Sequence, residues 1–170
     1  MKIVFNLDVL KCSACGACAI ACMDQNDIDI KNGQMPFRVV VDYEDREGKE
    51  IRYTYASISC MHCNDAPCVR SCPTGCIIKD AATGLTVYDH TKCVGCHSCA
   101  MACPYGVPTF GMDGKMQKCD GCFERIKHGM EPACCRACPV GALTCNILRN
   151  SDMVKKSEKV YSSYEYVESE

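Results

Sequence analysis

The most informative residues of this chain are cysteines whose spacing suits metal-cluster ligation. The segment 93–104 follows the pattern C-x2-C-x2-C-x3-C-P. Three thiolates on one tight loop at this spacing are typical ligands of a [4Fe–4S] cluster, and the cysteine before the proline typically ligates a neighbouring cluster. A run of this kind therefore predicts at least one partner run elsewhere in the chain.

Three further cysteine runs are present. The run at 12–22 follows C-x2-C-x2-C-x3-C, and the run at 60–73 follows C-x2-C-x4-C-x3-C-P. The run at 119–139 separates its second and third cysteines by eleven residues. Three runs end in the same Cys-Pro-x-Gly punctuation, which indicates internal repeats at 72–75, 103–106 and 138–141.

Four such runs predict one-electron transfer rather than catalysis. A cube with four cysteine ligands has no open iron for a substrate, so the protein's role is to space the clusters and set their potentials. The sequence has no nucleophile elbow and no glycine-rich phosphate loop after a predicted strand. We therefore predict that the chain is not itself an enzyme.

Two other uses of cysteine fit less well. The chain has nineteen cysteines in 170 residues, about 11%, which exceeds the ~8–10% that marks a crosslinked or metal-dense scaffold. A disulfide framework expects a secretory signal, but the N-terminal residues show neither an apolar h-region nor a twin-arginine pair. Zinc expects isolated C-x2-C pairs rather than triplets with a remote fourth cysteine. A zinc-binding scaffold without redox function is the alternative among these other uses of cysteine.

The charge balance bears on partners. The formal net charge is −2, and four clusters with their thiolates bring the loaded protein to about −10. This disfavours nucleic acid, which requires a basic surface. We interpret the basic residues nearest the runs as offsets to cluster charge: Lys11, Arg70, Lys92, Lys118, Arg125 and Arg136. No apolar segment approaches the ~18 residues of a membrane span, so direct membrane insertion is not expected.

Short elements must position these runs. Residues 3–9 predict a strand, and residues 17–25 predict a helix because Met23 stands where the other runs have proline. Residues 37–43 and 50–58 are rich in β-branched and aromatic types and predict a β-hairpin with a longer loop. This insertion either covers clusters or contacts a partner, or it only adds core.

The order of the runs, with x4 in the second and x11 in the last, resembles a known family. It is similar to the four-cluster ferredoxin-like electron-transfer subunits of molybdenum- and tungsten-pterin oxidoreductases, including those of dimethyl sulfoxide reductase and formate dehydrogenase. The resemblance covers residues 3–148. It implies an α+β fold of two pseudo-symmetric bacterial-ferredoxin-like domains, each with two [4Fe–4S] clusters, an inserted β-hairpin and a C-terminal tail.

The resemblance also implies how the runs pair, the first with the fourth and the second with the third. One cluster is then held by Cys12, Cys15, Cys18 and Cys138, and its neighbour by Cys22, Cys119, Cys122 and Cys134. The other two are held by Cys60, Cys63, Cys68 and Cys103, and by Cys72, Cys93, Cys96 and Cys99. Cys135 is an alternative to Cys134, because spacing alone does not separate an x11 gap from an x12 gap.

Some residues near the runs have no assigned ligand role. We interpret Cys76 and Cys145 as buried small hydrophobic residues. His62 and His97 lie inside cluster loops, where an imidazole either tunes a potential by hydrogen bonding or is simply a surface side chain.

The implied domain boundaries divide the chain into four parts. One ferredoxin-like domain combines residues 1–33 with 111–149, and the second comprises residues 56–110. Residues 34–59 form the hairpin insertion. The tail at 150–170 is predicted to dock on a partner.

The combined prediction is an electron-transfer subunit. Its partner would be a large molybdenum- or tungsten-pterin catalytic subunit of the aldehyde oxidoreductase, formate dehydrogenase or dimethyl sulfoxide reductase type, with a flavin-containing subunit as a further partner. A free polyferredoxin carrier is the alternative, although the hairpin and tail argue against it, since a shuttle needs small, transient contacts. Without an export signal, the expected location is the cytoplasm.

Overall fold

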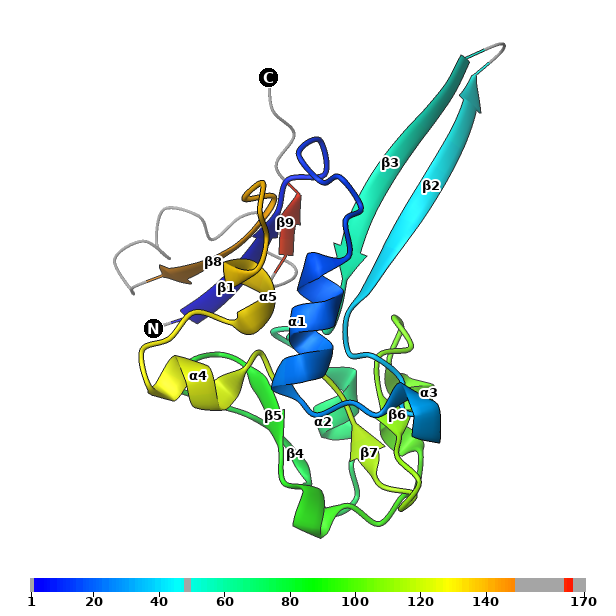
Figure 1. The fold of residues 1–170 in the computed structure, drawn as a ribbon. Coiled ribbons are helices and arrows are strands. Elements are labelled where there is room, and N and C mark those ends of the chain that lie inside the picture. Colours follow the sequence, from blue (N-terminus) through cyan, green and yellow to red (C-terminus); the bar gives the residue numbers. More distant parts are fainter. Residues whose placement is uncertain (1, 48–49, 149–163, 167–170) are drawn as a thin grey trace.

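A computed structural model of the chain describes residues 2–47, 50–148 and 164–166. Short helices and strands form a body from which one long hairpin projects (Figure 1). This mixture agrees with the predicted α+β class. No helix within these described residues has the length and apolar character needed to cross a bilayer.

The two ends of the chain meet in one small sheet. Strand β1 (Lys2–Leu7) pairs antiparallel with β8 (Leu143–Leu148) and parallel with the short β9 (Tyr164–Tyr166). The strand expected at 3–9 is therefore confirmed. Its buried side chains, including Phe5, face a core that also receives Leu85 from the middle of the chain. Apart from β9, the predicted tail lies outside the described residues.

Two pairs of helices pack together beside the cysteine loops. Helix α1 (Ala17–Gln25) has the predicted bounds and packs against α5 (Ala133–Arg136). Helix α2 (Pro67–Arg70) packs in the same way against α3 (Ser98–Ala102). Each pair therefore joins two runs, the first with the fourth and the second with the third.

Smaller elements complete the body. Two short antiparallel hairpins follow the second and third runs, and α4 follows the start of the fourth run. Single 3-10 turns lie at Ile30–Asn32 and His90–Lys92. The remaining bounds are β4 (Ile77–Lys79), β5 (Thr86–Tyr88), β6 (Thr109–Phe110), β7 (Met116–Gln117) and α4 (Phe123–Lys127).

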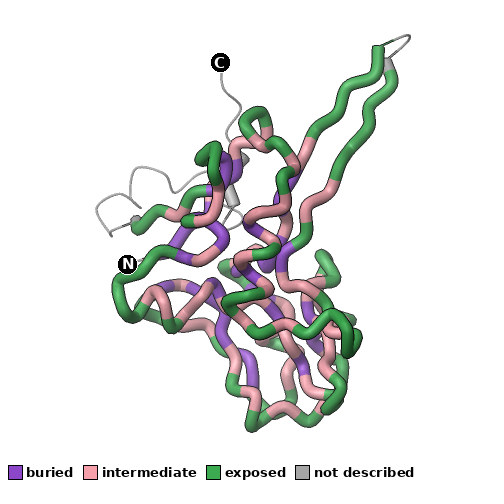
Figure 2. The backbone as a smooth tube through the Cα atoms, viewed as in Figure 1, coloured by how far each residue is buried: buried purple, intermediate pink, exposed green. Residues whose placement is uncertain are grey.

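The projecting hairpin is longer than the sequence predicts. Strands β2 (Val39–Glu47) and β3 (Glu50–Ile58) pair continuously from Val39–Ile58 out to Glu47–Glu50. The outer part of the arm is exposed on both faces, so its charged residues pair without the apolar alternation that marks a strand in sequence. Only its base is buried against the body (Figure 2).

Candidate iron–sulfur sites

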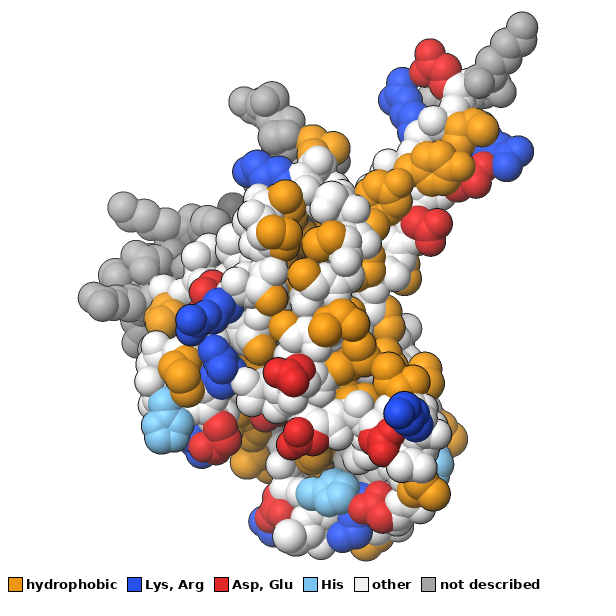
Figure 3. Space-filling model, in the orientation of Figure 1, with side chains coloured by type: hydrophobic (Ala, Val, Ile, Leu, Met, Phe, Trp, Pro, Cys, Tyr) orange, Lys and Arg blue, Asp and Glu red, His pale blue; other side chains and the backbone are white. Residues whose placement is uncertain are grey.

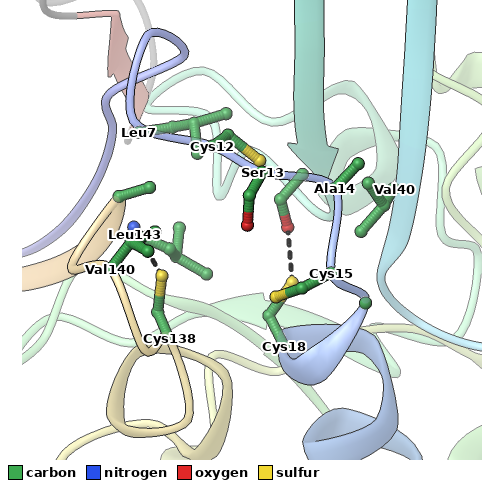
Figure 4. A pocket seen from close by; sticks show the side chains of 13 residues that line it. Leu7, Cys12, Ser13, Ala14, Cys15, Cys18, Val40, Cys138, Val140 and Leu143 are labelled. Atoms are coloured by element: carbon green, nitrogen blue, oxygen red, sulfur yellow. Dashed lines mark hydrogen bonds between the residues drawn. The ribbon is translucent and has the colours of Figure 1, made fainter.

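The first candidate site, site 1, joins the two ends of the chain. Its thiols come from the loop before α1, from the first turn of α1 and from the loop after α5, and all four line one cavity with an empty volume of about 330 Å³ (Figure 4). Most of the other lining side chains are apolar, including Leu7, Val40 and Leu143. The four thiols are those of Cys12, Cys15, Cys18 and Cys138.

Two hydrogen bonds already reach the sulfur atoms of site 1. The backbone N–H of Leu143 donates to Cys138 Sγ at 3.4 Å, and the Ser57 hydroxyl lies 3.1 Å from Cys18 Sγ. Both are drawn in Figure 4. Donors of this kind stabilise thiolates and raise the potential of a cluster that the thiolates hold.

A second cavity, site 4, lies in the middle part of the chain and has a similar empty volume of about 280 Å³. Ile77 and Met116 line it, as Leu143 and Leu7 line site 1. The backbone N–H of Met116 donates to Cys93 Sγ at 3.2 Å. The thiols in this cavity that belong to one predicted ligand set are Cys72, Cys93, Cys96 and Cys99.

Site 2 lies deeper in the protein and gathers Cys22, Cys119, Cys122 and Cys134. Burial raises the pKa of Cys22 to about 12, and the neighbouring charges of Cys134 and Cys122 contribute. Burial also raises the pKa of Cys119, with further contributions from Cys60 and Cys22. These charge effects place Cys122, Cys134 and Cys119 within interaction range of Cys22, the thiol common to all three interactions.

Site 3 gathers Cys60, Cys63, Cys68 and Cys103. Burial raises the pKa of Cys63, and the charges of Cys60 and Cys103 add to this. Burial also raises the pKa of Cys68, and the charges of Cys60, Cys103 and Cys63 raise it further. The structure thus places the thiols of sites 1 and 4 around one cavity each, and it places thiols of sites 2 and 3 within range of one another's charge.

The chemistry of these groups fits cubane clusters. Within the described residues, no three His, Cys, Asp or Glu side chains converge as they would around a single metal ion. A [4Fe–4S] cube is different, because each of its four thiolates caps a separate iron. Each site offers four cysteines, three from one run and one from a remote run, and each includes at least one buried thiol.

The three leftover cysteines occupy distinct places. Cys135 is buried in the core beside β1. Its thiol forms hydrogen bonds with the thiols of Cys134 and the half-buried Cys145. The charge of Cys134, by contrast, acts on Cys22 of site 2, and the Cys135 thiol and then the Arg38 guanidinium lower the pKa of Cys134. Cys76 is buried at the wall of site 4, where its thiol forms a hydrogen bond with the thiol of Cys93.

All four runs share one backbone feature. The residue before the second cysteine has a positive φ in each run, at Ala14, His62, Gly95 and Gly121. This conformation turns the amide back toward the first cysteine, and the N–H groups of His62 and Gly121 donate to Cys60 Sγ and Cys119 Sγ at 3.5 and 3.3 Å. Glycine marks this turn in the last two runs, whereas nothing in the sequence marks it at Ala14 or His62.

Cations that are buried or partly buried near sites 2 and 3 include two that sequence reasoning missed. Lys118, expected as a charge offset, is almost fully buried, and its Nζ donates to the carbonyls of Thr86 and Cys119. Lys79 was not expected there. Its Nζ donates to the His62 carbonyl at 2.6 Å, and burial lowers its pKa to about 8. Arg38, from the base of the hairpin, was also missed, because a lone arginine before a strand carries no sequence signal.

Comparison with known proteins places this arrangement among iron–sulfur proteins. A family model described as a 4Fe-4S dicluster domain matches residues 51–147. The chain is 37% identical over 148 residues to the probable anaerobic dimethyl sulfoxide reductase chain YnfG of Escherichia coli (strain K12), and equally to a second anaerobic dimethyl sulfoxide reductase chain of the same organism. These alignments cover 82% of this chain and 70% of each relative.

A second kind of relative is similar over a comparable share of the chain. The iron-sulfur subunit of the nitrate-inducible formate dehydrogenase of Escherichia coli (strain K12) is 30% identical over 151 residues. That alignment covers 81% of this chain and 51% of the relative. The chain therefore spans only about half the length of this relative.

Proposed function

Because the chain belongs to the 4Fe-4S dicluster domain family, we propose that it relays single electrons through four [4Fe–4S] clusters to or from a molybdenum- or tungsten-pterin catalytic subunit. When bound, the clusters supply the electron transfer itself. The chain's own residues hold them, space them and set their potentials. Relatives named as chains or subunits of dimethyl sulfoxide reductase and formate dehydrogenase support this role.

The observation that carries the proposal is that neighbouring sites share one short helix. Cys18 and Cys22 lie one turn apart on α1 and belong to sites 1 and 2. Similarly, Cys99 on α3 belongs to site 4, while Cys103 just after it belongs to site 3. A cysteine one turn beyond its own triplet is displaced toward the next cluster, which places the two clusters close together.

The two pairs of sites are joined by their inner members. The charge of Cys60 in site 3 acts on Cys119 in site 2, and both thiols contact His62. The sites thus follow one another in the order 1, 2, 3, 4. At the two ends of this series, Cys15 and Cys96 are exposed, whereas Cys22, Cys60 and Cys134 are buried. Exposed end sites are where electrons would enter and leave.

The same features support two pseudo-symmetric domains. Residues 1–33 and 111–149 hold sites 1 and 2 around the α1–α5 pair, and residues 56–110 hold sites 3 and 4 around the α2–α3 pair. The glycine of each Cys-Pro-x-Gly segment has a φ between 61° and 64°, at Gly75, Gly106 and Gly141. Repeated backbone geometry of this kind is expected if the domains arose from one repeated unit.

The insertion at 34–59 supports a role within a complex. Apolar side chains follow the visible face of the arm and continue onto the body (Figure 3). Ile51 and Tyr53 are about half exposed and point to the same face of β3, because alternate residues of a strand share a face. We assign this arm and the tail at 150–170 to contacts with the catalytic subunit. A flavin-containing subunit at the far end and a cytoplasmic location complete the proposal.

The test is an anaerobic purification from the native source, followed by iron, molybdenum and tungsten analysis. We expect roughly sixteen irons per chain and a larger co-eluting subunit that carries molybdenum or tungsten. The same iron content in a lone 18.7 kDa species would instead indicate a free polyferredoxin. Zinc in place of iron would contradict both.

A further inference from the structure

Arg38 is a buried cation between two candidate cluster sites. Its exposed fraction is 1%, although arginine is rarely buried to this extent. It precedes β2, so the base of the hairpin insertion inserts it into the body. Burying a guanidinium is costly unless it meets hydrogen-bond acceptors and opposite charge. The groups around Arg38 therefore indicate which negative charge its guanidinium stabilises.

The groups around Arg38 belong mainly to site 2. Its charge acts on Cys22, Cys119 and Cys134, three of the four thiols of that site, and its side chain also hydrogen-bonds Cys134. The charge of Arg38 also acts on the His62 imidazole. Arg38 stays protonated at any ordinary pH, so it is a fixed positive charge beside site 2.

A hydrogen-bonded chain extends from Arg38 to site 1. Arg38 Nη1 donates to the Ser57 carbonyl at 3.2 Å and to Ser57 Oγ at 2.9 Å. Because a guanidinium only donates, Ser57 Oγ is the acceptor in that contact. When Cys18 is a thiolate ligand, it has no hydrogen to donate, and the Ser57 hydroxyl is then the donor to Cys18 Sγ, 3.1 Å away. The cation polarises this hydroxyl and strengthens its bond to the sulfur.

We propose that Arg38 and Ser57, at the base of the hairpin, are potential-setting residues that raise the reduction potentials of sites 2 and 1. With a [4Fe–4S] cluster bound, reduction of a site would add one electron, supplied by the adjacent cluster, and would transfer no bond or proton. The added negative charge is stabilised by a nearby fixed cation and by hydrogen bonds to the ligand sulfurs. The insertion thus acts on the clusters as well as extending away from them.

This inference rests on the proposed function, so the experiment separates the two. The holoprotein is purified anaerobically, its iron is counted, and the midpoint of each cluster is measured by titration followed with electron paramagnetic resonance. Signals are assigned with Cys15→Ser for site 1, Cys122→Ser for site 2 and Cys96→Ser for site 4. Iron content and the number of reduced-cluster signals in the unchanged protein test the proposed function. Only shifts in the variants below test the role of Arg38 and Ser57.

The first variant is Arg38→Gln, which removes the charge. We expect the equilibrium constant for reducing site 2 to fall at least tenfold, equivalent to 59 mV for a one-electron couple, with site 4 unchanged. Arg38→Lys keeps the charge and should retain the site 2 potential to within that interval. Ser57→Ala should lower the potential of site 1 and leave site 2 unchanged. Arg52→Gln, an exposed position on the same hairpin, is the matched control and should change nothing.

Several outcomes would overturn the inference. One is a fully iron-loaded Arg38→Gln protein with all potentials unchanged, and another is an equal shift at all four sites. A fall in Arg38→Lys as large as that in Arg38→Gln would rule out the charge as the cause. If Arg38→Gln does not assemble clusters, Ser57→Ala decides. An unchanged site 1 potential in Ser57→Ala then overturns the proposal.

Discussion

His62 Nε2 lies 3.8 Å from Cys119 Sγ and so connects the second cysteine run to the fourth. On the other side of the ring, Nδ1 accepts a hydrogen bond from the Thr86 N–H at 3.1 Å. A neutral imidazole that accepts at Nδ1 carries its hydrogen on Nε2, which is then directed at the cysteine sulfur. Burial, with help from Lys118, Lys79 and Arg38, holds the pKa of His62 well below its ordinary value, so the ring is neutral.

Replacement of His62 by Asn should therefore lower the potential of site 2. Asparagine tolerates the positive φ at this position, but its shorter side chain does not extend as far toward Cys119. We expect the equilibrium constant for reduction of site 2 to fall about tenfold, or about 1.4 kcal/mol, with site 1 affected less. Potentiometric titration followed by electron paramagnetic resonance measures this shift.

The control is His97→Asn, which replaces the histidine that lies inside the third cysteine run. His97 also has a positive φ, but it is exposed and stacks on Phe110. Its replacement should leave all four potentials unchanged. Equal shifts in the two variants, or no shift in His62→Asn with full iron content, would contradict a hydrogen-bonding role for His62.

These two histidines show what the sequence could and could not predict. Cysteine spacing, with the family resemblance, was enough to group the cysteines that the fold brings together, because the covalent distance between cysteines on a loop limits which cube corners they reach. The sequences of these loops do not show whether a histidine inside them is buried. The surface interpretation is right for His97 and wrong for His62, which is fully buried because the strand that follows site 3 covers it.

The missed cations and the long hairpin have a different cause. Arg38 is buried by contacts with residues far away in the chain, and no local pattern encodes such contacts. The pairing of β2 beyond Tyr43 involves a run of charged residues in solvent, so this part of β2 itself shows no apolar alternation. The strand at 3–9 and the helix at 17–25 were predictable because their side chains or flanking residues specify them directly.

Separate replacement of Cys134 and Cys135 should distinguish ligand from core residue. Cys134→Ala removes a thiol of site 2, so we expect the loss of one cluster, about four of roughly sixteen irons per chain, and of its resonance signal. Cys135→Ala should retain all iron and lose about 1 kcal/mol of stability from its small buried side chain. Iron analysis and thermal unfolding measure the two effects. The reverse pattern would assign Cys135 as the ligand.

Gly95 should tolerate no side chain, although Ala14 occupies the equivalent position in the first run. A Cβ on Gly95 would lie 2.5 Å from the Gly114 carbonyl oxygen, and φ is 68°. The left-handed conformation alone costs about 1–2 kcal/mol, and a clash with backbone adds to it. We expect Gly95→Ala to lower the thermal midpoint and the occupancy of site 4, while Ala14→Gly remains fully loaded. Equal iron content and stability in Gly95→Ala and the wild type would contradict this account.

The exposed arm of the hairpin should contribute to association and not to cluster assembly. Ile51 and Tyr53 lie far from the buried base, so Ile51→Ser combined with Tyr53→Ser should leave iron content and all four potentials unchanged. If the arm contacts the catalytic subunit, burying these two side chains contributes to affinity, and their loss should weaken association roughly 10- to 100-fold, since buried aromatic anchors often contribute about 2 kcal/mol. Co-purification at falling protein concentration measures this. Met112→Ser, an equally apolar-to-polar change at an exposed turn of the body, is the control. If both variants retain the partner equally well, the arm has no docking role, and its function is limited to the contacts that Arg38 and Ser57 make at its base.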